Sequence, residues 1–156
     1  MDAQSVKNTD TAALKGYDAG KKVSGIKRHI AVDTQGLPHA VAVTTAEVTD
    51  RNGALRALQR CKCGLKRVQS LLCDSGYVGQ PFAQGVKDIL AEHVTVQIAK
   101  RSELHTFKVM PQRWVVERSF AWLEKNRRLW KNCERLLNTS LQFIHLAFLA
   151  LLLKRF

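Results

Sequence analysis

Two apolar segments joined by a tight turn constrain the fold of this chain more than any other feature. Residues 27–32 and 37–44 are rich in valine, alanine and isoleucine, and Asp33-Thr-Gln-Gly36 between them is typical of a hairpin turn. Further strand patterns cover residues 67–73 and 94–99, with a helical pattern before each. A hairpin followed by alternating helices and strands predicts an α/β fold in which helices cover a mixed sheet.

Helical patterns fill the intervals between these strands and follow the last of them. Thr49 or Asp50 can cap the first helix. Pro81 suits the first turn of the second helix, because proline lacks an N–H that would be unpaired there. A last, apolar helix is predicted over about residues 139–154, and it is too short to span a bilayer. We therefore expect a buried C-terminal helix and no membrane partner.

The chain is short and strongly basic. Its 156 residues suit one domain, and 25 lysine and arginine residues against 13 aspartate and glutamate residues give a net charge of +12. Such an excess of positive charge without a basic tail indicates a polyanion partner, of which nucleic acid is the first candidate. The four cysteines lack the spacing of a zinc module, and no signal peptide is evident, so the expected setting is the cytoplasm.

One acid stands out in a helix predicted over residues 113–130. At about 100° per residue, the apolar face of this helix carries Trp122 and Trp130, which we expect to be buried. Glu117 lies at the solvent border of the same helix, among arginines. An acid in that place could ligate a metal at a phosphate site, or it could form a surface ion pair. From the helix alone, the ion pair is the simpler interpretation.

A second acid, Asp74, ends the strand over residues 67–73 and enters a Ser-Gly turn. Its carboxylate should project at the carboxyl end of the strand, the edge at which ligands gather in sheets with helical crossovers. An Asx-turn or a helix cap is the alternative role. A two-metal phosphoryl-transfer site needs several carboxylates from different elements, and Asp74 and Glu117 could supply two of them.

Five segments, in order along the chain, resemble the transposases of bacterial insertion sequences that carry a DDE catalytic triad. The segments are Gly16-Tyr-Asp-Ala-Gly-Lys-Lys22, Gly25-Ile-Lys-Arg-His-Ile-Ala-Val-Asp-Thr-Gln-Gly36, Ala46-Glu-Val-Thr-Asp-Arg-Asn-Gly53, Asp74-Ser-Gly-Tyr-Val-Gly79 and Arg113-Trp-Val-Val-Glu-Arg-Ser-Phe-Ala-Trp-Leu123. The resemblance covers nearly the whole chain and is to the insertion sequence four/five-like group. It implies a ribonuclease H-like fold, DNA as partner, a bacterial cytoplasmic setting and a homo-oligomeric assembly.

The resemblance also implies roles for individual acids. Asp74 is similar to the second catalytic aspartate and Glu117 to the catalytic glutamate. The first aspartate of the family lies in an Asp-Ser-Gln-Ser-Val pattern, to which Asp2-Ala-Gln-Ser-Val6 is similar. Asp33 is the rival, but it stands in a hairpin turn, and we favour Asp2. The three acids would hold two Mg²⁺ or Mn²⁺ ions for phosphodiester hydrolysis and strand transfer at the ends of the element.

Two departures from the family pattern bear on activity. Glu124 stands where the family often carries a basic residue, although Lys125 and Arg128 are close by. The family also has a first strand and a DNA-binding segment ahead of the position of Asp2. We therefore expect residues 1–156 to form an incomplete catalytic domain that lacks most or all of the first strand, with residues 1–22 as an extended or loop segment.

These departures leave other functions open. The chain could be a catalytically inactive remnant, or a DNA-binding subunit that needs an upstream reading-frame product, or an RNA-processing nuclease of similar fold. In the transposase interpretation, basic side chains contact DNA phosphates. The candidates are Lys21, Lys22, Lys27, Arg28, Lys100, Arg101, Arg113, Lys125, Arg127 and Arg128.

Overall fold

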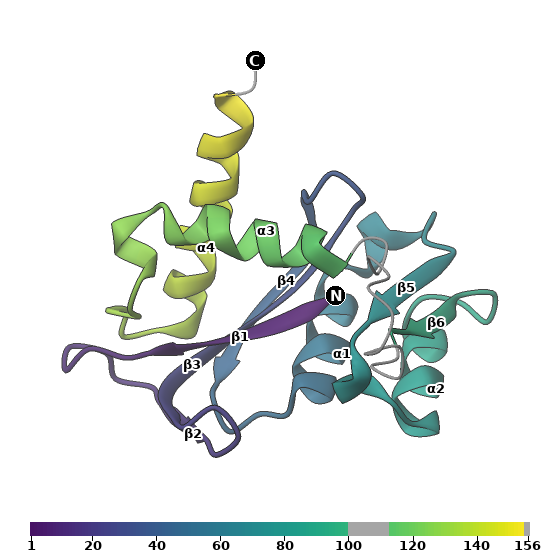
Figure 1. The fold of residues 1–156 in the computed structure, drawn as a ribbon, viewed down its shortest axis with the longest axis horizontal. Helices are drawn as coiled ribbons and strands as arrows, with labels where there is room; N and C mark the ends of the chain where they lie inside the picture. Colours follow the sequence, from purple (N-terminus) through teal and green to yellow (C-terminus); the bar gives the residue numbers. More distant parts are fainter. Residues whose placement is uncertain (100–112, 155–156) are drawn as a thin grey trace, which may run out of the picture.

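The computed structural model describes residues 1–99 and 113–154 as a mixed α/β fold (Figure 1). Its elements are, in chain order, β1 (Asp2–Lys7), β2 (Gly16–Asp18), β3 (Val23–Val32), β4 (Pro38–Thr45), α1 (Asp50–Cys61), η1 (Lys62–Leu65), β5 (Ser70–Cys73), η2 (Ser75–Tyr77), α2 (Gln80–Ile89), β6 (Thr95–Ile98), α3 (Arg113–Glu124), η3 (Arg127–Leu129) and α4 (Leu137–Leu153). The predicted hairpin, the alternation that follows it and the last helix are confirmed.

The main sheet is built around β3, which has antiparallel partners along both of its edges. β1 pairs with it from Asp2 opposite Ile30 to Lys7 opposite Gly25. β4 pairs along the other edge, and β2 adds a short pairing near the start of β3. β5 and β6 form a separate, two-stranded parallel sheet, and all residues of β5 are paired with β6.

Alternate residues of the hairpin face opposite helical layers. Ala31 and its cross-strand partner Ala40 belong to a core with α1, α2 and β5. Ile30 and its partner Val41 belong to a second core with α3 and α4. Because successive side chains of a strand point to opposite faces, the sheet is covered by helices on both sides (Figure 1).

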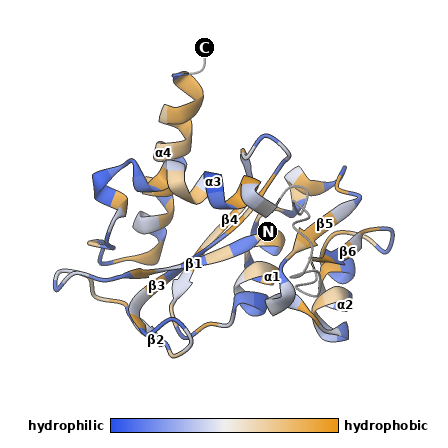
Figure 2. Ribbon diagram, in the orientation of Figure 1, coloured by the Kyte–Doolittle hydropathy of each residue, from blue (hydrophilic) through white to orange (hydrophobic). Residues whose placement is uncertain are grey.

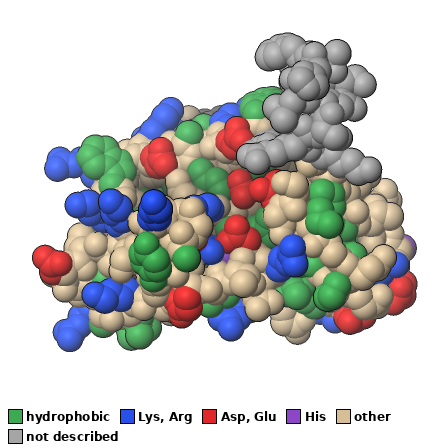
Figure 3. Space-filling model, turned by 60° about the horizontal axis from the view of Figure 1, so that its bottom comes forward, with side chains coloured by type: hydrophobic (Ala, Val, Ile, Leu, Met, Phe, Trp, Pro, Cys, Tyr) green, Lys and Arg blue, Asp and Glu red, His purple; other side chains and the backbone are tan. Residues whose placement is uncertain are grey.

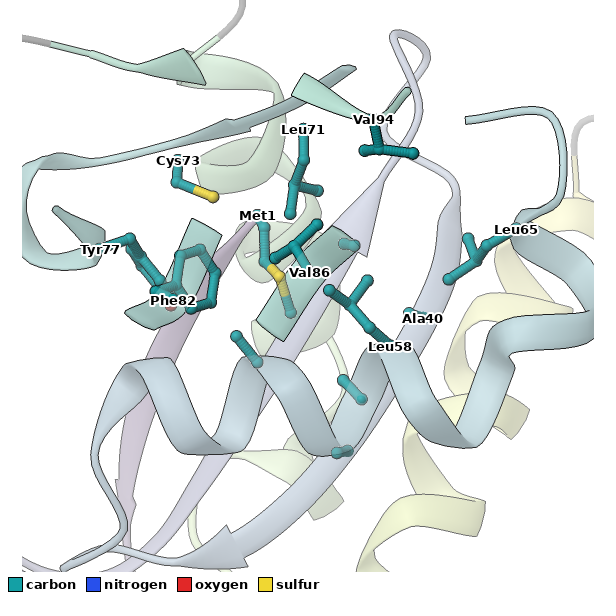
Figure 4. Close-up of a cluster of buried hydrophobic side chains, with 14 residues drawn as sticks. Met1, Ala40, Leu58, Leu65, Leu71, Cys73, Tyr77, Phe82, Val86 and Val94 are labelled. Atoms are coloured by element: carbon teal, nitrogen blue, oxygen red, sulfur yellow. The ribbon is translucent and has the colours of Figure 1, made fainter. Parts of the chain in front are cut away.

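Residue Met1 lies in the first of these cores, beside Leu71 and Val86 (Figure 4). Its amino group donates a hydrogen bond of 2.6 Å to the carbonyl of Leu72 in β5, and burial lowers the pKa of this amine. The segment expected to be extended or a loop, residues 1–22, contains a paired strand, since β1 begins at Asp2 and pairs with β3 along its whole length. The signal was weak because Ala3 and Val6 are the buried side chains of this polar strand.

The helix α3 is shorter than predicted. It ends at Glu124. Just beyond this end, the side-chain amide of Asn126 donates to the carbonyls of Trp122 and Leu123, which in a longer helix would accept backbone N–H groups of the next turn. Trp130 lies beyond this end and is 62% exposed, so its predicted burial is wrong.

The C-terminal helix α4 is apolar along most of its length (Figure 2). Ile144 and Phe148 are buried in the second core, whereas Leu146, Leu149 and Leu153 on the outer side are exposed. The helix is therefore buried on one side rather than on all sides. Among the helices that the structure describes, none combines the length and the apolarity needed to cross a membrane.

Candidate active site

The Asp2 side chain lies on the face of the main sheet that α3 covers. Cross-strand partners in an antiparallel pair share a face, and Asp2 lies opposite Ile30, which packs in the core with α3. The backbone N–H of Ala3 donates to its carboxylate at 2.7 Å. Burial raises the pKa of Asp2, the bond from Ala3 opposes this, and the nearby carboxylate of Asp74 raises the pKa further.

The Asp74 side chain comes from a different element. It follows the last residue of β5, and its carboxylate accepts the N–H of Gly76 at 2.9 Å as the cap of η2. The cap that the sequence suggested as an alternative role is therefore present. It leaves Asp74 at the carboxyl end of the strand, where a ligand-binding acid was expected.

Asp2 and Asp74 line one cavity of about 320 Å³. Val115 and Val116 of α3 form part of its wall, and apolar side chains of β5 together with Leu58 of α1 form another part. Two half-buried carboxylates with a common cavity repel each other, and a divalent cation between them would relieve that repulsion. Carboxylate oxygens are also the ligands that Mg²⁺ prefers, so this pair fits part of a metal site.

Residue Glu117 follows Val116 on α3 and is exposed. In residues 1–99 and 113–154, no three His, Cys, Asp or Glu side chains lie close enough together to hold one metal ion. The structure therefore brings Asp2 and Asp74 together and places Glu117 on the adjoining helix, outside that pair.

The Asp33 carboxylate is engaged by its own turn. It accepts the backbone N–H groups of Gln35 and Leu37 at 2.8 and 2.9 Å, and it pairs with His39 at 3.2 Å. Burial alone would raise the pKa of Asp33, but these bonds outweigh it and lower the pKa. Asp33 borders the same cavity as Asp2, yet its contacts are those expected of turn chemistry.

The predicted phosphate-binding residues differ in their placement. Exposed side chains are those of Lys21, Lys22, Lys125, Arg127 and Arg128. Buried ones are Lys27, which pairs with Asp18 and Asp50 at 3.2 and 2.9 Å, and Arg28, which donates to the Leu129 carbonyl at 2.7 Å. Lys100 and Arg101 lie outside the described residues, and Arg113 begins α3.

Lys27 and Arg28 each bind other groups inside the protein, so neither belongs to the proposed DNA surface. Figure 3 shows several lysine and arginine side chains gathered on the left of one face, with acidic side chains among them and others nearer the centre. The basic side chains on this part of the surface suit a polyanion.

Sequence reasoning missed the partners of Glu124. Its carboxylate accepts the side-chain N–H of Gln4 at 2.8 Å, and its charge raises the pKa of Arg28 against the larger, lowering effect of burial. Gln4 lies two residues after Asp2 in β1 and 120 residues before Glu124, so no local pattern could have linked them. Glu124 thus joins the end of α3 to the strand of Asp2.

Comparison with known proteins gives the class of protein that this fold and these acids define. The transposase DDE domain family matches residues 1–153, and the chain belongs to that family. It is similar to a protein assigned as a transposase for insertion sequence element IS402 from Burkholderia cepacia, with 36% identity over 134 residues. That match covers 81% of this chain and spans about 60% of the length of the relative. No solved structure matches.

Proposed function

We propose that this chain takes part in DNA transposition by metal-dependent hydrolysis and strand transfer at insertion-sequence ends, with Asp2, Asp74 and Glu117 as the catalytic acids. The observation that carries the proposal is the meeting of Asp2 and Asp74 at one cavity, beside the helix that bears Glu117. Membership of the transposase DDE family supports it. A sheet with an antiparallel hairpin, a parallel pair and helices on both faces also supports the ribonuclease H-like fold implied by the resemblance.

The chemistry follows from the three carboxylates. Together they would hold two Mg²⁺ or Mn²⁺ ions, which when bound activate a water or a DNA 3′-hydroxyl and stabilise the leaving oxygen. Asp2 contributes from the start of β1 and Asp74 from the end of β5, so the pair joins the two sheets. Lys125 and Arg127, just beyond α3, are exposed and would bind backbone phosphates of DNA near the acids.

Nicking of element-end DNA in the presence of Mg²⁺ tests the proposal. The near-isosteric variants Asp2→Asn, Asp74→Asn and Glu117→Gln should each lower the nicking rate by more than about 100-fold while circular dichroism shows a folded chain. Asp10→Asn, at an exposed position, serves as the matched control. Asp33→Asn separates the two candidates for the first aspartate, because loss of a turn contact should lower stability and leave more activity than Asp2→Asn. Full activity of Asp2→Asn would overturn the assignment.

A second candidate function is that of a DNA-binding subunit, or an inactive remnant, that requires an upstream partner. The division of the described strands into two sheets supports it, because β1 meets β5 through the bond from Met1 to Leu72 rather than through a continuous ladder. Nicking by this chain alone, and by this chain fused to its upstream sequence, distinguishes the candidates. Cleavage only by the fusion would support a partner requirement, and binding without cleavage in both would support the inactive subunit.

A further inference from the structure

The turn between β3 and β4 has a backbone fixed by hydrogen bonds. The Asp33 carboxylate accepts two backbone N–H groups of the turn, and the Gly36 N–H donates to the Asp33 carbonyl at 3.1 Å. Gly36 has a φ of +86°, a conformation that favours glycine. With its N–H groups used internally, the turn offers carbonyl oxygens of Gln35 and Gly36 to a neighbouring element.

That neighbouring element is α3, and the contacting residues follow Glu117 directly. The Ser119 hydroxyl, which is fully buried, has two acceptors within reach of its one proton, the Gly36 carbonyl at 2.7 Å and the Val115 carbonyl of its own helix at 3.0 Å, and the shorter contact is the one to the turn. The Arg118 guanidinium donates to the Gln35 carbonyl at 2.8 Å. Turn and helix touch closely, since a Cβ added at Gly36 would lie 2.9 Å from the Ser119 hydroxyl oxygen.

The Arg118 side chain is itself held between two aromatic rings. Its guanidinium carbon lies 4.5 Å from the ring centroid of Trp114 and 4.9 Å from that of Trp122. These residues stand four positions before and four after Arg118, so all three lie along one side of α3. Stacking of this kind restricts the rotamers of the arginine and presents its N–H groups to the turn in a fixed direction.

Strand pairing and hydrogen bonds therefore connect Asp2 to Glu117, through a β3–β4 pairing whose register shifts between Ala31 and Val32. Asp2 pairs with Ile30 in β3, β3 leads into the Asp33 turn, and the turn bonds to the two residues after Glu117. Bonds at successive helix positions fix both the rotation of α3 about its axis and its position along that axis. Such control matters at a reaction centre, where a displacement of about 1 Å can lower the rate by about 100-fold.

We propose that the β3–β4 turn positions Glu117, and that Arg118 and Ser119 are the positioning residues through which it acts. The inference rests on the proposed function, because it gives Glu117 a role in holding divalent cations. The β3–β4 turn is thus a brace for α3, the helix that carries Glu117. The Asp33 carboxylate contributes by fixing the backbone of this brace through its hydrogen bonds.

Binding of Mn²⁺, measured by isothermal titration calorimetry, tests the brace without requiring DNA cleavage. Ser119→Ala should weaken Mn²⁺ binding by about 10-fold or more, as loss of outer-shell support does at other metal sites. Ser140→Ala is the matched control, since Ser140 is also a buried helical serine whose hydroxyl bonds internally, here to Asn132. Its Mn²⁺ affinity should equal that of the unaltered chain even if its thermal stability is lowered to the same extent.

A double-mutant cycle shows whether Ser119 acts through Glu117. In a Glu117→Gln background, Ser119→Ala should cause no further loss of Mn²⁺ affinity. An equal loss in both backgrounds, or unchanged affinity in the folded single variant, would overturn the inference. If Ser119→Ala does not fold, Arg118→Lys replaces it in the cycle, because it retains the charge and loses the stacked, planar group.

The outcomes also separate this inference from the proposed function. Unchanged Mn²⁺ binding and nicking by Glu117→Gln itself would refute the role of Glu117, and with it both proposals. A defective Glu117→Gln beside a normal Ser119→Ala would refute the brace alone.

Discussion

The His29 side chain lies in the middle of the main sheet with no exposed surface. Its Nε2 atom shares a hydrogen bond of 2.9 Å with the Thr44 hydroxyl on the neighbouring strand. Burial lowers the pKa of His29 to about 4, and the charge of Asp50 opposes this only in part. The folded chain thus keeps this imidazole neutral at a pH where an unfolded chain would protonate it.

This difference makes stability depend on pH in a defined direction. Between the unfolded pKa of about 6.5 and the folded pKa of about 4, the unfolded chain binds more protons, so the free energy of unfolding should fall as the pH falls. The full loss is on the order of 3.5 kcal/mol, from about 1.4 kcal/mol for each of about 2.5 units of pKa difference. Urea unfolding at pH 7.5, 6, 5 and 4 measures it. His29→Gln should show a much smaller loss over this interval, and an equal loss would contradict the assignment to His29.

The Lys27 side chain is a second buried polar group with a structural role. Its ammonium group pairs with Asp18 and Asp50 and also donates to the Val48 carbonyl at 3.0 Å. Removing one partner of a buried ion pair leaves uncompensated charge, so Lys27→Met should lower the free energy of unfolding by about 3–5 kcal/mol. Lys22→Met, at an exposed position nearby, should stay within about 0.5 kcal/mol of the unaltered chain. Equal effects in urea unfolding would show that the network adds no stability.

At the scale of elements, α1 and β3 approach each other more closely than side chains normally allow. Gly53 of α1 faces the His29 ring, and a Cβ at this position would lie 2.0 Å from a ring carbon. Gly53→Ala should therefore destabilise the chain by about 1–3 kcal/mol or more, although alanine favours helices. Gly64→Ala introduces the same methyl group where nothing lies within 4 Å, and its stability should be unchanged or slightly raised. Thermal unfolding of the two variants makes the comparison.

How far elements could be predicted from sequence depended on how local their causes were. Thr49 does cap α1, accepting the N–H of Asn52, because a capping residue acts within one turn. The hairpin of β3 and β4 followed from alternating apolar residues and turn chemistry. β1 gave little signal, since backbone bonds to β3 hold it and most of its side chains are polar. The apolar pattern continued to Trp130 and so predicted a longer α3. The end of the helix is marked instead by the side-chain amide of Asn126, which the pattern did not reveal.

The same reasoning applies to the candidate site. Asp74 was predictable because a strand end and a turn are local features. The proximity of Asp2 to Asp74, across 72 positions, came from the resemblance and not from any pattern in the residues. The contact of Gln4 with Glu124 and the bond of Ser119 to the β3–β4 turn had no sequence signal, because each joins segments more than 80 residues apart.

For the whole molecule, the net charge of +12 favours binding of a polyanion, and such binding should weaken as the salt concentration rises. Each phosphate contact releases condensed counterions, so log K falls as log salt rises, and the magnitude of this negative slope should decrease by about 1 when a contacting lysine or arginine is replaced. We expect this for Lys125→Ala and Arg127→Ala, and a smaller change for Arg128→Ala, because Arg128 already pairs with Glu134 at 2.6 Å. Fluorescence anisotropy of labelled DNA across KCl concentrations measures the slopes. Lys62→Ala, on the separate helix η1, should leave the slope unchanged, and an equal change there would show that the binding is delocalised.

The bridge between Asn8 and Asn132 also has a consequence for how the chain is made. The backbone N–H of Asn132 donates to the Lys7 carbonyl at 2.8 Å, and the Asn132 carbonyl accepts the N–H of Thr9 at 2.9 Å. On the ribosome, β1 emerges long before its partner in this bridge, because these bonds can form only after residue 132 has left the exit tunnel. Closing so long a loop carries an entropic cost that grows with the logarithm of its length. The pairing of β1 with β3 requires only residues up to Ile30, whereas the end of β1 stays without these later partners until residue 132 has been synthesised.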